Sequence, residues 1–217
     1  SPVGGPAPVL DLATVAADLT LFGGDEKDYL ADRFSLAQGD FNGDGLADIL
    51  VGAPLADGPD NGRENAGEAY VIFGSSTLAP TVDVALGQQD LTIVGGASGD
   101  NLGFVVASGD VNGDDLDDIL VGARFARGAG PGGGNAGEAY VIFGSADLGG
   151  TVDISQGQQD FTVLGADAGD YLGFALASGD LNGDGADDII VAAPGGDGPD
   201  NARLDAGEAY VVLGSTD

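Results

Sequence analysis

Three short segments of this chain combine Asp, Asn and Gly in a pattern that suits the binding of a hard cation. The first reads Asp-Phe-Asn-Gly-Asp-Gly-Leu-Ala-Asp at residues 40–48, and it recurs with few changes at 110–118 and 180–188, a constant spacing of 70 residues. Alternate side chains of a tight loop can converge on one point, and Gly in the sixth place permits the sharp bend. The candidate ligands are the side chains in places one, three, five and nine and the carbonyl oxygen in place seven: Asp40, Asn42, Asp44, Leu46 and Asp48; Asp110, Asn112, Asp114, Leu116 and Asp118; Asp180, Asn182, Asp184, Ala186 and Asp188.

The ligand set of each loop consists of oxygen atoms alone. Hard oxygen ligands in a flexible loop favour Ca²⁺, which takes roughly 6–8 of them at about 2.3–2.6 Å, whereas Mg²⁺ requires stricter octahedral geometry. The chain has no His and no Cys, which disfavours Zn²⁺ and Cu²⁺. We therefore expect about one Ca²⁺ for each repeat.

An alternative interpretation is that Asn-Gly-Asp-Gly only supplies hairpin-turn chemistry. The three copies keep their Asp and Asn residues in phase, and this regularity favours the cation. The middle loop carries Asp115 where the others carry Gly45 and Gly185. Because Asp tolerates left-handed backbone better than most residues do, we expect the middle loop to bind, but less tightly.

The composition points to a folded, all-β protein with metal ions as its natural counter-charge. The chain has 217 residues, of which 43% are apolar and 41 are Gly, and its formal net charge is −30. Nucleic acid is a poor partner, since its binding needs clustered Lys and Arg. We expect no membrane insertion, because no apolar run approaches 18 residues. Adaptation to salt would also explain a high acidic content, but not acids at fixed spacing.

The repeat divides the chain into units 7–78, 79–148 and 149–217, preceded by a linker at 1–6. Each unit contains four runs of β-branched and aromatic residues between Gly, Asp and Pro clusters, and such runs are typical of strands. In the first unit they fall at 18–22, 34–37, 48–53 and 68–73. Four short strands in a repeating unit indicate β-propeller blades. We therefore predict three four-stranded antiparallel blades per chain.

The residues resemble the FG-GAP repeat of integrin α-subunit propellers. The resemblance rests on Phe34, the cation loop, the strand Val-Gly-Ala-Pro at 51–54 and the strand Gly-Glu-Ala-Tyr at 67–70, in that order. It covers all three units. It departs in unit two, where Arg124 replaces Pro54, and at the residue after each Phe, which is not Gly. The resemblance implies Ca²⁺ in the loop between the first two strands of a blade, with ligand-contacting loops on the other side.

Three blades are too few for a closed ring, because propellers usually have about 4–8. Two chains joined head to tail would form a six-bladed ring, and we expect such a homodimer. The alternative is that the chain belongs to a longer array. The sequence begins without Met and shows no signal peptide, as expected for a processed or excised product.

We expect a calcium-binding propeller module of an extracellular or cell-surface protein that serves adhesion or protein interaction. The basic residues fall in connections opposite the cation loops, and we expect a protein or glycan ligand on that side: Lys27, Arg33, Arg63, Arg124, Arg127 and Arg203. We expect no enzyme, since the acids are repeated and a catalytic site is usually unique. The alternatives are a carbohydrate-acting enzyme using paired carboxylates, and an engineered or fragment scaffold without a native ligand.

Overall fold

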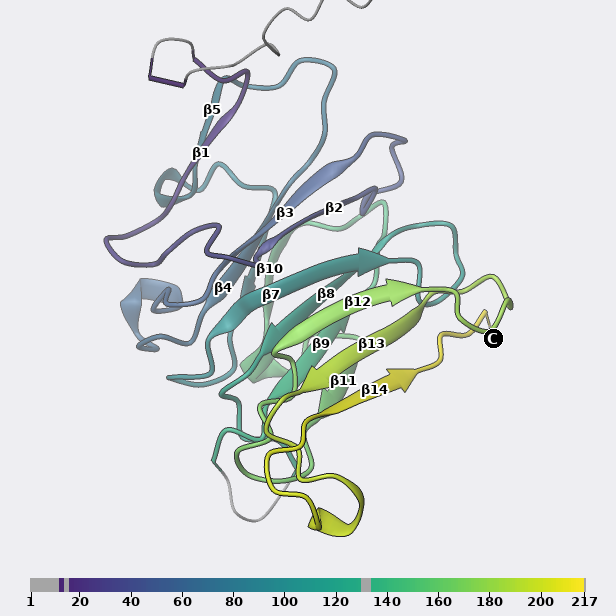
Figure 1. Cartoon of the computed structure of the whole chain (residues 1–217). Coiled ribbons are helices and arrows are strands. Elements are labelled where there is room, and N and C mark those ends of the chain that lie inside the picture. The colour runs from purple at the N-terminus through teal and green to yellow at the C-terminus, as the bar shows by residue number, and fades with distance from the viewer. Residues whose placement is uncertain (1–11, 14–15, 130–133, 217) are drawn as a thin grey trace, which may run out of the picture.

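The computed structural model describes residues 12–13, 16–129 and 134–216, and its regular structure is almost entirely β-strand (Figure 1). The linker expected at 1–6 lies outside the described residues. The strands are β1 (Thr20–Phe22), β2 (Leu36–Gly39), β3 (Asp48–Ala53), β4 (Glu68–Ile72), β5 (Thr81–Asp83), β6 (Leu91–Val94), β7 (Leu102–Gly109), β8 (Asp118–Ala123), β9 (Glu138–Ile142), β10 (Gly150–Asp153), β11 (Phe161–Leu164), β12 (Ala175–Gly179), β13 (Asp188–Ala193) and β14 (Glu208–Val212). Within the described ranges the helices are short 3₁₀ turns: η1 (Pro59–Asn61), η2 (Val84–Leu86), η3 (Ile154–Gln156) and η4 (Pro199–Asn201). Among these residues there is no helix with the length and apolarity that a membrane crossing needs.

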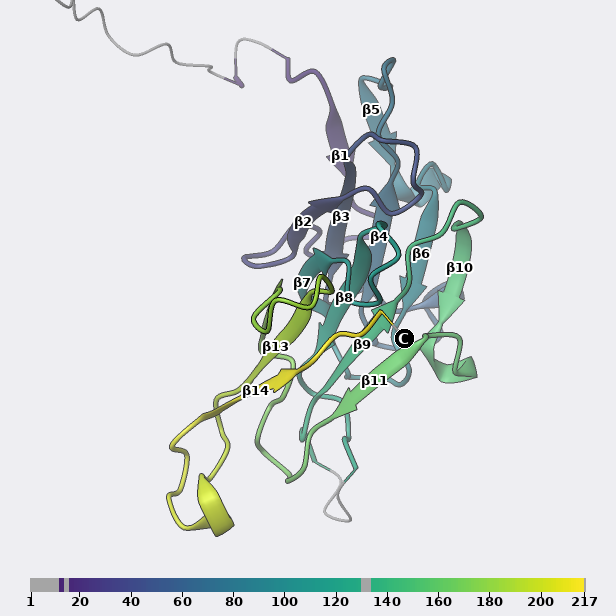
Figure 2. The ribbon, with the colours of Figure 1, turned by 90° about the vertical axis from the view of Figure 1, so that its right-hand side faces the viewer.

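The strands form propeller blades, as the sequence predicts. The first sheet has the order β10-β6-β4-β3-β2 and the second has the order β11-β9-β8-β7. Strands β2, β3, β4 and β6 are antiparallel neighbours in that order, and so are β7, β8, β9 and β11. The innermost strands β2, β7 and β12 lie side by side, so the blades fan out from a common edge (Figures 1 and 2).

The second strand of each blade lies in the middle of the packing. Residues Asp48–Ala53 and Asp118–Ala123 share the sequence Asp-Ile-Leu-Val-Gly-Ala, and every residue of β8 is buried. A strand covered on both faces is expected to be apolar almost throughout, rather than to alternate between apolar and polar residues. The first and third blades cover β8, whereas β3 lies between the second blade and the apolar residues of β1 and β5.

The outer strand of a blade comes from the following repeat unit. Strand β6 lies in the second unit of the sequence, yet it pairs with β4 of the first, with Tyr70 opposite Thr92 and Val71 opposite Leu91. Strand β11 pairs with β9 in the same way. The first two blades therefore cross a unit boundary, and the units 7–78, 79–148 and 149–217 remain a description of how the sequence repeats.

A fifth strand extends the outer edge of a blade. Strand β10 runs parallel to β6, and β5 runs parallel to β1. Both lie in long connections between a blade's third strand and its outer strand. After each fifth strand the chain reverses through a 3₁₀ turn that ends at a left-handed Gly, Gly87 or Gly157.

Two sheets are incomplete in the part of the chain that the structure describes. The third blade consists of β12, β13 and β14 alone, and β1 with β5 forms a separate two-stranded sheet. These two sheets lie at opposite sides of the fan (Figure 2).

The blades pack through apolar faces and through close backbone contact. Leu50, Val71 and Leu91 of the first blade share a core with Ile119 and Val121 of the second. Where the blades approach most closely, a Cβ added to Gly52 would lie 2.0 Å from the carbonyl oxygen of Gly103. Glycine is required at residue 52 because the neighbouring blade occupies the space of a side chain.

We predict that Gly52→Ala destabilises the protein by about 1–3 kcal/mol, because the methyl group must push a rigid backbone away and open the interface between blades. Urea unfolding followed by circular dichroism measures the change. Gly149→Ala is the matched control, since the nearest atom to its added Cβ is 3.5 Å away. Equal free energies of unfolding for the two variants would contradict the steric explanation.

Candidate cation-binding loops

The three candidate loops lie at the same end of the blades. Each connects the innermost strand of a blade to the second strand: residues 40–47 join β2 to β3, 110–117 join β7 to β8, and 180–187 join β12 to β13. The structure thus brings the predicted ligands of each loop into one short turn, with Asp48, Asp118 and Asp188 as the first residues of the strands that follow.

In the first loop, the carboxylate of Asp40 organises the turn. It accepts hydrogen bonds from the backbone N–H of Gly43 at 2.8 Å, of Asp44 at 3.1 Å and of Gly45 at 2.8 Å. Gly43 and Gly45 have φ angles of 73° and 84°, in the left-handed region where Gly carries no steric penalty. The turn therefore wraps its amide groups around the side chain in place one.

The side chains in places three and five stabilise the same turn. Asn42 Oδ1 accepts from the N–H of Asp44 at 2.9 Å, and Asp44 Oδ1 accepts from the N–H of Leu46 at 2.8 Å. Such side-chain bonds to a backbone N–H two residues onward are the Asx turns that favour Asn and Asp in loops. The oxygens of places one, three and five therefore all lie on the inner side of one turn.

The other two loops repeat this geometry. Asp110 accepts from three loop amides, including that of Asp115 at 2.9 Å, and Asp180 accepts from Gly183 and Gly185. Asp115 has a φ of 70°, so it occupies the left-handed conformation that Gly adopts in the other loops. The substitution of Asp for Gly thus leaves the turn unchanged, as the sequence predicts.

The Asp in place nine forms the floor of the loop. Asp48 is fully buried, its Oδ2 accepts from the N–H of Phe41 at 2.9 Å, and its Oδ1 accepts from the N–H of Gly74 at 2.7 Å. Asp118 and Asp188 make the equivalent pairs of bonds. This carboxylate therefore ties the loop to the segment that leaves the third strand of the same blade.

The pKa values of the carboxylates in place nine, Asp48 and Asp118, are raised, as expected where acidic groups are crowded and buried. Burial raises the pKa of Asp48, the two backbone N–H groups oppose that shift, and the nearby charges of Asp44 and Asp40 raise the pKa further. The same causes raise the pKa of Asp118 to about 6. The carboxylates of a loop thus repel one another, and a divalent cation would relieve that repulsion.

The donor set suits Ca²⁺, although the ligand assignment stays a prediction. Within the described ranges, no group of three or more His, Cys, Asp or Glu residues is arranged to hold a metal ion. A carboxylate has about four lone-pair sites, so Asp40 can accept its amide bonds and still present a lone pair to a cation. Asp40, Asn42, Asp44, the Leu46 carbonyl and Asp48 would hold the ion, which would neutralise their charge and fix the turn.

Neighbouring loops are bonded to one another. The N–H of Asp40 donates to Asp117 Oδ2 at 2.8 Å, and the N–H of Asp117 donates back to the carbonyl oxygen of Asp40 at 3.2 Å. Between the second and third loops, the N–H of Asp187 donates to the carbonyl oxygen of Asp110 at 2.7 Å. The residue in place one of a loop is thus held by the next blade.

The opposite end of the blades carries the basic residues. All six lie before an innermost strand or after a second strand, and the antiparallel pairing places these connections away from the cation loops. The guanidinium group of Arg124 lies 3.5 Å from the ring centre of Phe104 and 4.4 Å from that of Phe125. Burial and the charge of Arg33 lower the pKa of Arg124. Arg124 therefore packs as a stacked side chain at the junction of two blades.

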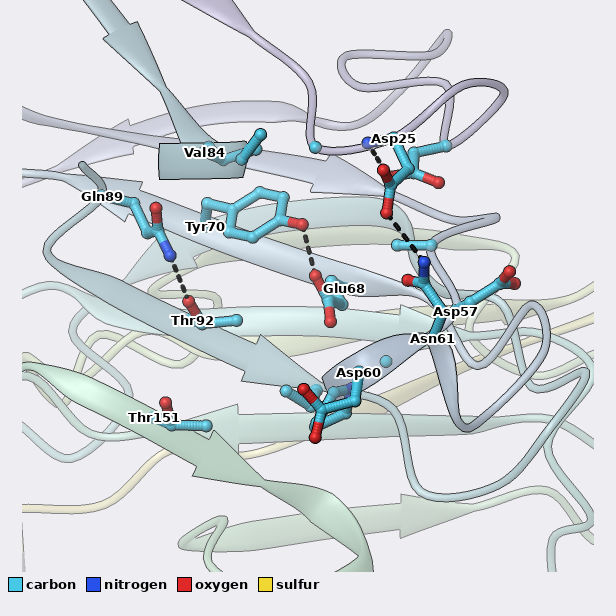
Figure 3. A pocket seen from close by; sticks show the side chains of 17 residues that line it. Asp25, Asp57, Asp60, Asn61, Glu68, Tyr70, Val84, Gln89, Thr92 and Thr151 are labelled. Carbon is cyan, nitrogen blue, oxygen red and sulfur yellow. Dashed lines mark hydrogen bonds between the residues drawn. The ribbon is translucent and has the colours of Figure 1, made fainter. Parts of the chain in front are cut away.

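A pocket that the sequence analysis missed lies beside the outer strand of the first blade (Figure 3). It has a volume of about 340 Å³, and the Tyr70 hydroxyl points into it and donates to Glu68. Burial raises the pKa of both groups. Tyr70 and Tyr140 also pack in the core, and Glu and Tyr two residues apart on one strand face the same side. The second blade has an equivalent pocket around Glu138 and Tyr140.

Comparison with known proteins agrees with this architecture. Residues 34–72, 102–142 and 172–212 match the FG-GAP repeat. This chain belongs to the FG-GAP repeat family. Each match begins near the innermost strand of a blade and ends with its third strand, which confirms the resemblance stated from the sequence.

Two kinds of protein contain stretches similar to these FG-GAP repeats. Phosphatidylinositol-glycan-specific phospholipase D of Rattus norvegicus is 34% identical over 161 residues, which is 73% of this chain and 18% of that protein. Integrin alpha pat-2 of Caenorhabditis elegans is 31% identical over 217 residues, which is 91% of this chain and 15% of that protein. Integrin alpha-PS2 of Drosophila melanogaster is 34% identical over 166 residues. The chain thus spans less than one fifth of the length of these relatives.

The expectation that the chain is no enzyme is wrong. The similar proteins include a phospholipase D, which is an enzyme by its name. The expectation rested on the repetition of acids within this chain. That repetition describes the FG-GAP blades and does not describe the reactions of proteins in which such blades occur.

We predict that Asp48→Ala lowers the free energy of unfolding by about 2–5 kcal/mol in the presence of a chelator, because it leaves the amides of Phe41 and Gly74 without their acceptor. Asp44→Ala, in an exposed part of the same loop, should cost less than about 1 kcal/mol under those conditions. Urea unfolding of both variants in EDTA measures the difference. An equal loss would show that Asp48 has no special role in the fold of an FG-GAP blade.

Proposed function

We propose that this chain is a calcium-binding FG-GAP propeller module of an extracellular or cell-surface protein, and that it serves adhesion through contacts with another protein. The single observation that supports calcium binding is that the loops 40–48, 110–118 and 180–188 share one geometry. In each copy, two carboxylates and an amide oxygen line one turn above a buried Asp.

The charge of the chain supports a cation as a stabilising ligand. With a net charge of −30, the folded chain holds its carboxylates closer together than the unfolded chain does. Ions that bind the folded loops and not the unfolded chain shift the equilibrium toward the fold. Bound Ca²⁺ would then act through stability, by fixing the end of each blade at which the loops lie.

The integrin relatives support the adhesive role and the location outside the cell. The face opposite the cation loops is the candidate recognition surface. Tyr29 is exposed there, near a cavity of about 190 Å³ that Asn101 and Arg124 also line, and Arg33 is exposed beside it. Exposed aromatic and Arg side chains are enriched where proteins bind one another.

We predict that 1 mM CaCl₂ raises the thermal midpoint by about 10 °C or more relative to EDTA. A ligand at one hundred times its Kd adds about 2.7 kcal/mol per site, and three sites act together. Differential scanning calorimetry at matched ionic strength measures the shift. The variant Asp44→Ala, Asp114→Ala, Asp184→Ala should lose most of this rise, while its midpoint in EDTA should fall only by the small cost of three lost turn bonds.

Magnesium chloride at equal ionic strength is the control for screening of the acidic surface. A midpoint that rises equally with Mg²⁺, with NaCl and in the triple variant would contradict specific calcium binding. In that case, screening of the surface charge would account for the whole effect.

The recognition surface has its own test. Cells should attach to a surface coated with the chain in Ca²⁺, and Tyr29→Ala with Arg33→Ala should reduce attachment at least threefold. Asp147→Ala, an exposed change at the cation-loop end, is the matched control. Attachment that is unchanged in both variants would exclude this face as the binding surface.

A further inference from the structure

The two incomplete sheets are complementary halves of one blade. The complete first sheet has the order β10-β6-β4-β3-β2, in which β6 is the outer strand and β10 is the parallel fifth strand. The sheet β12-β13-β14 lacks both of these strands in the described residues, and the sheet β1-β5 consists of an outer strand and a parallel fifth strand. Two strands added to three reproduce the five-stranded order.

The sequence of β1 matches that of the outer strands. Asp-Leu-Thr-Leu-Phe at 18–22 corresponds to Asp-Leu-Thr-Ile-Val at 90–94 and to Asp-Phe-Thr-Val-Leu at 160–164. In the two complete blades the Asp of this strand accepts a hydrogen bond from the residue after the third strand. Asp90 accepts from the N–H of Phe73 at 2.7 Å and Asp160 accepts from that of Phe143 at 2.8 Å. The corresponding residues at the incomplete blade are Asp18 and Leu213.

The exposure of β14 shows which surface lacks a cover. Val211 is 51% exposed, whereas the equivalent Val71 and Val141 are 0% and 2% exposed. Tyr210 is 37% exposed, whereas Tyr70 and Tyr140 are 4% and 3% exposed. An uncovered strand edge with apolar side chains is a surface suited to strand addition.

An ion pair at the complete blade has unpaired counterparts at the two halves. Arg63 donates from Nη1 to Asp153 Oδ1 at 2.9 Å and from Nη2 to Asp153 Oδ2, so the connection after β3 is fastened to the fifth strand β10. The residues equivalent to this pair are Arg203, in the connection after β13, and Asp83 on β5. Within the described part of the chain, neither Arg203 nor Asp83 forms an ion pair.

We propose that a second copy of this chain completes the third blade. Strand β1 of one copy pairs antiparallel with β14 of the other, with Thr20 opposite Tyr210 and Leu21 opposite Ala209, and Asp83 of the first copy pairs with Arg203 of the second. The contact is head to tail, so two copies joined at two such junctions close a ring. Two copies joined in this way bring six blades together, a number within the usual range of about 4–8.

The charge pair gives the first test, which does not depend on calcium binding. Sedimentation equilibrium should show a mass of twice 21.2 kDa for the unchanged chain. Arg203→Asp should weaken the dimer at least tenfold, because it places two carboxylates together, and so should Asp83→Arg. Combining the two changes in one chain should restore the dimer to within about threefold. Lys27→Asp, which makes the same charge change at an exposed side chain, should leave the mass unaltered.

The combined variant decides the matter, because Asp83 also caps η2 by accepting from the N–H of Ala85, and its replacement alone could disturb the fold.

A disulfide gives a second, independent test in a chain that has no Cys of its own. Thr20→Cys with Tyr210→Cys should give a covalent dimer on mild oxidation. Thr20→Cys with Ala209→Cys is the control, since these side chains would lie on opposite faces of the sheet.

A folded chain with a mass of 21.2 kDa at 100 µM, judged by an unchanged circular dichroism spectrum, would overturn the proposal. It would leave the edge of β14 to further repeats of a longer polypeptide. Equal crosslinking of the two Cys pairs would also overturn it, because random collision between chains would then explain the product.

Discussion

The first two blades of this protein each depend on an outer strand that belongs to the next repeat. The third strand of a blade exposes a row of N–H and C=O groups, and burial of unpaired backbone groups is costly. In the first two blades that row is satisfied by β6 and β11, which run directly into the innermost strand of the following blade. A complete blade therefore needs the neighbouring repeat, and the stability of the array lies in its junctions as much as in its units.

The cation loops follow from the same constraint. The innermost strand of a blade is the last strand of its sheet and must turn sharply into the second strand. The buried Asp at the start of the second strand holds the loop against the segment that leaves the third strand. The carboxylate in place nine is thus part of the fold before any ion is considered. The acids in places one, three and five add charge around a turn that is already closed by hydrogen bonds.

Much of this architecture could be predicted from the sequence, because the 70-residue period fixes the number of blades and the position of every loop. The sequence does not show which blade the outer strand belongs to. A periodic sequence has no marked beginning, so the run at 90–94 can be assigned to the unit before it or the unit after it. Only the pairing of Val71 with Leu91 decides between them. The fifth strands were also missed, since Thr81–Asp83 and Gly150–Asp153 are too short for a clear alternating pattern.

At the candidate site, the sequence predicts the loop turn but does not reveal the pocket around Glu68 and Tyr70. The spacing of Asp, Asn and Gly predicts the turn, and the left-handed φ of 70° at Asp115 confirms that Asp can replace Gly there. The pair formed by Glu68 and Tyr70 was overlooked because a repeated Tyr in a strand is usually core packing. The ligand set itself stays a prediction. Oxygen atoms that accept amide bonds in a closed turn can also bind a cation, so the closed turn is compatible with the predicted ligands.

Hydrogen bonds between neighbouring loops couple the loops at the acidic end of the blades. The backbone of Asp40 is bonded in both directions to Asp117, and Asp110 accepts from the backbone of Asp187. A cation held by Asp110 would therefore restrain the third loop as well as its own, and ordering one loop would lower the conformational entropy that the next must lose. Three loops bonded in series should respond to Ca²⁺ as one unit, because the same backbone bonds that align the blades also join the residue in place one of a loop to the residue in place eight of the next loop.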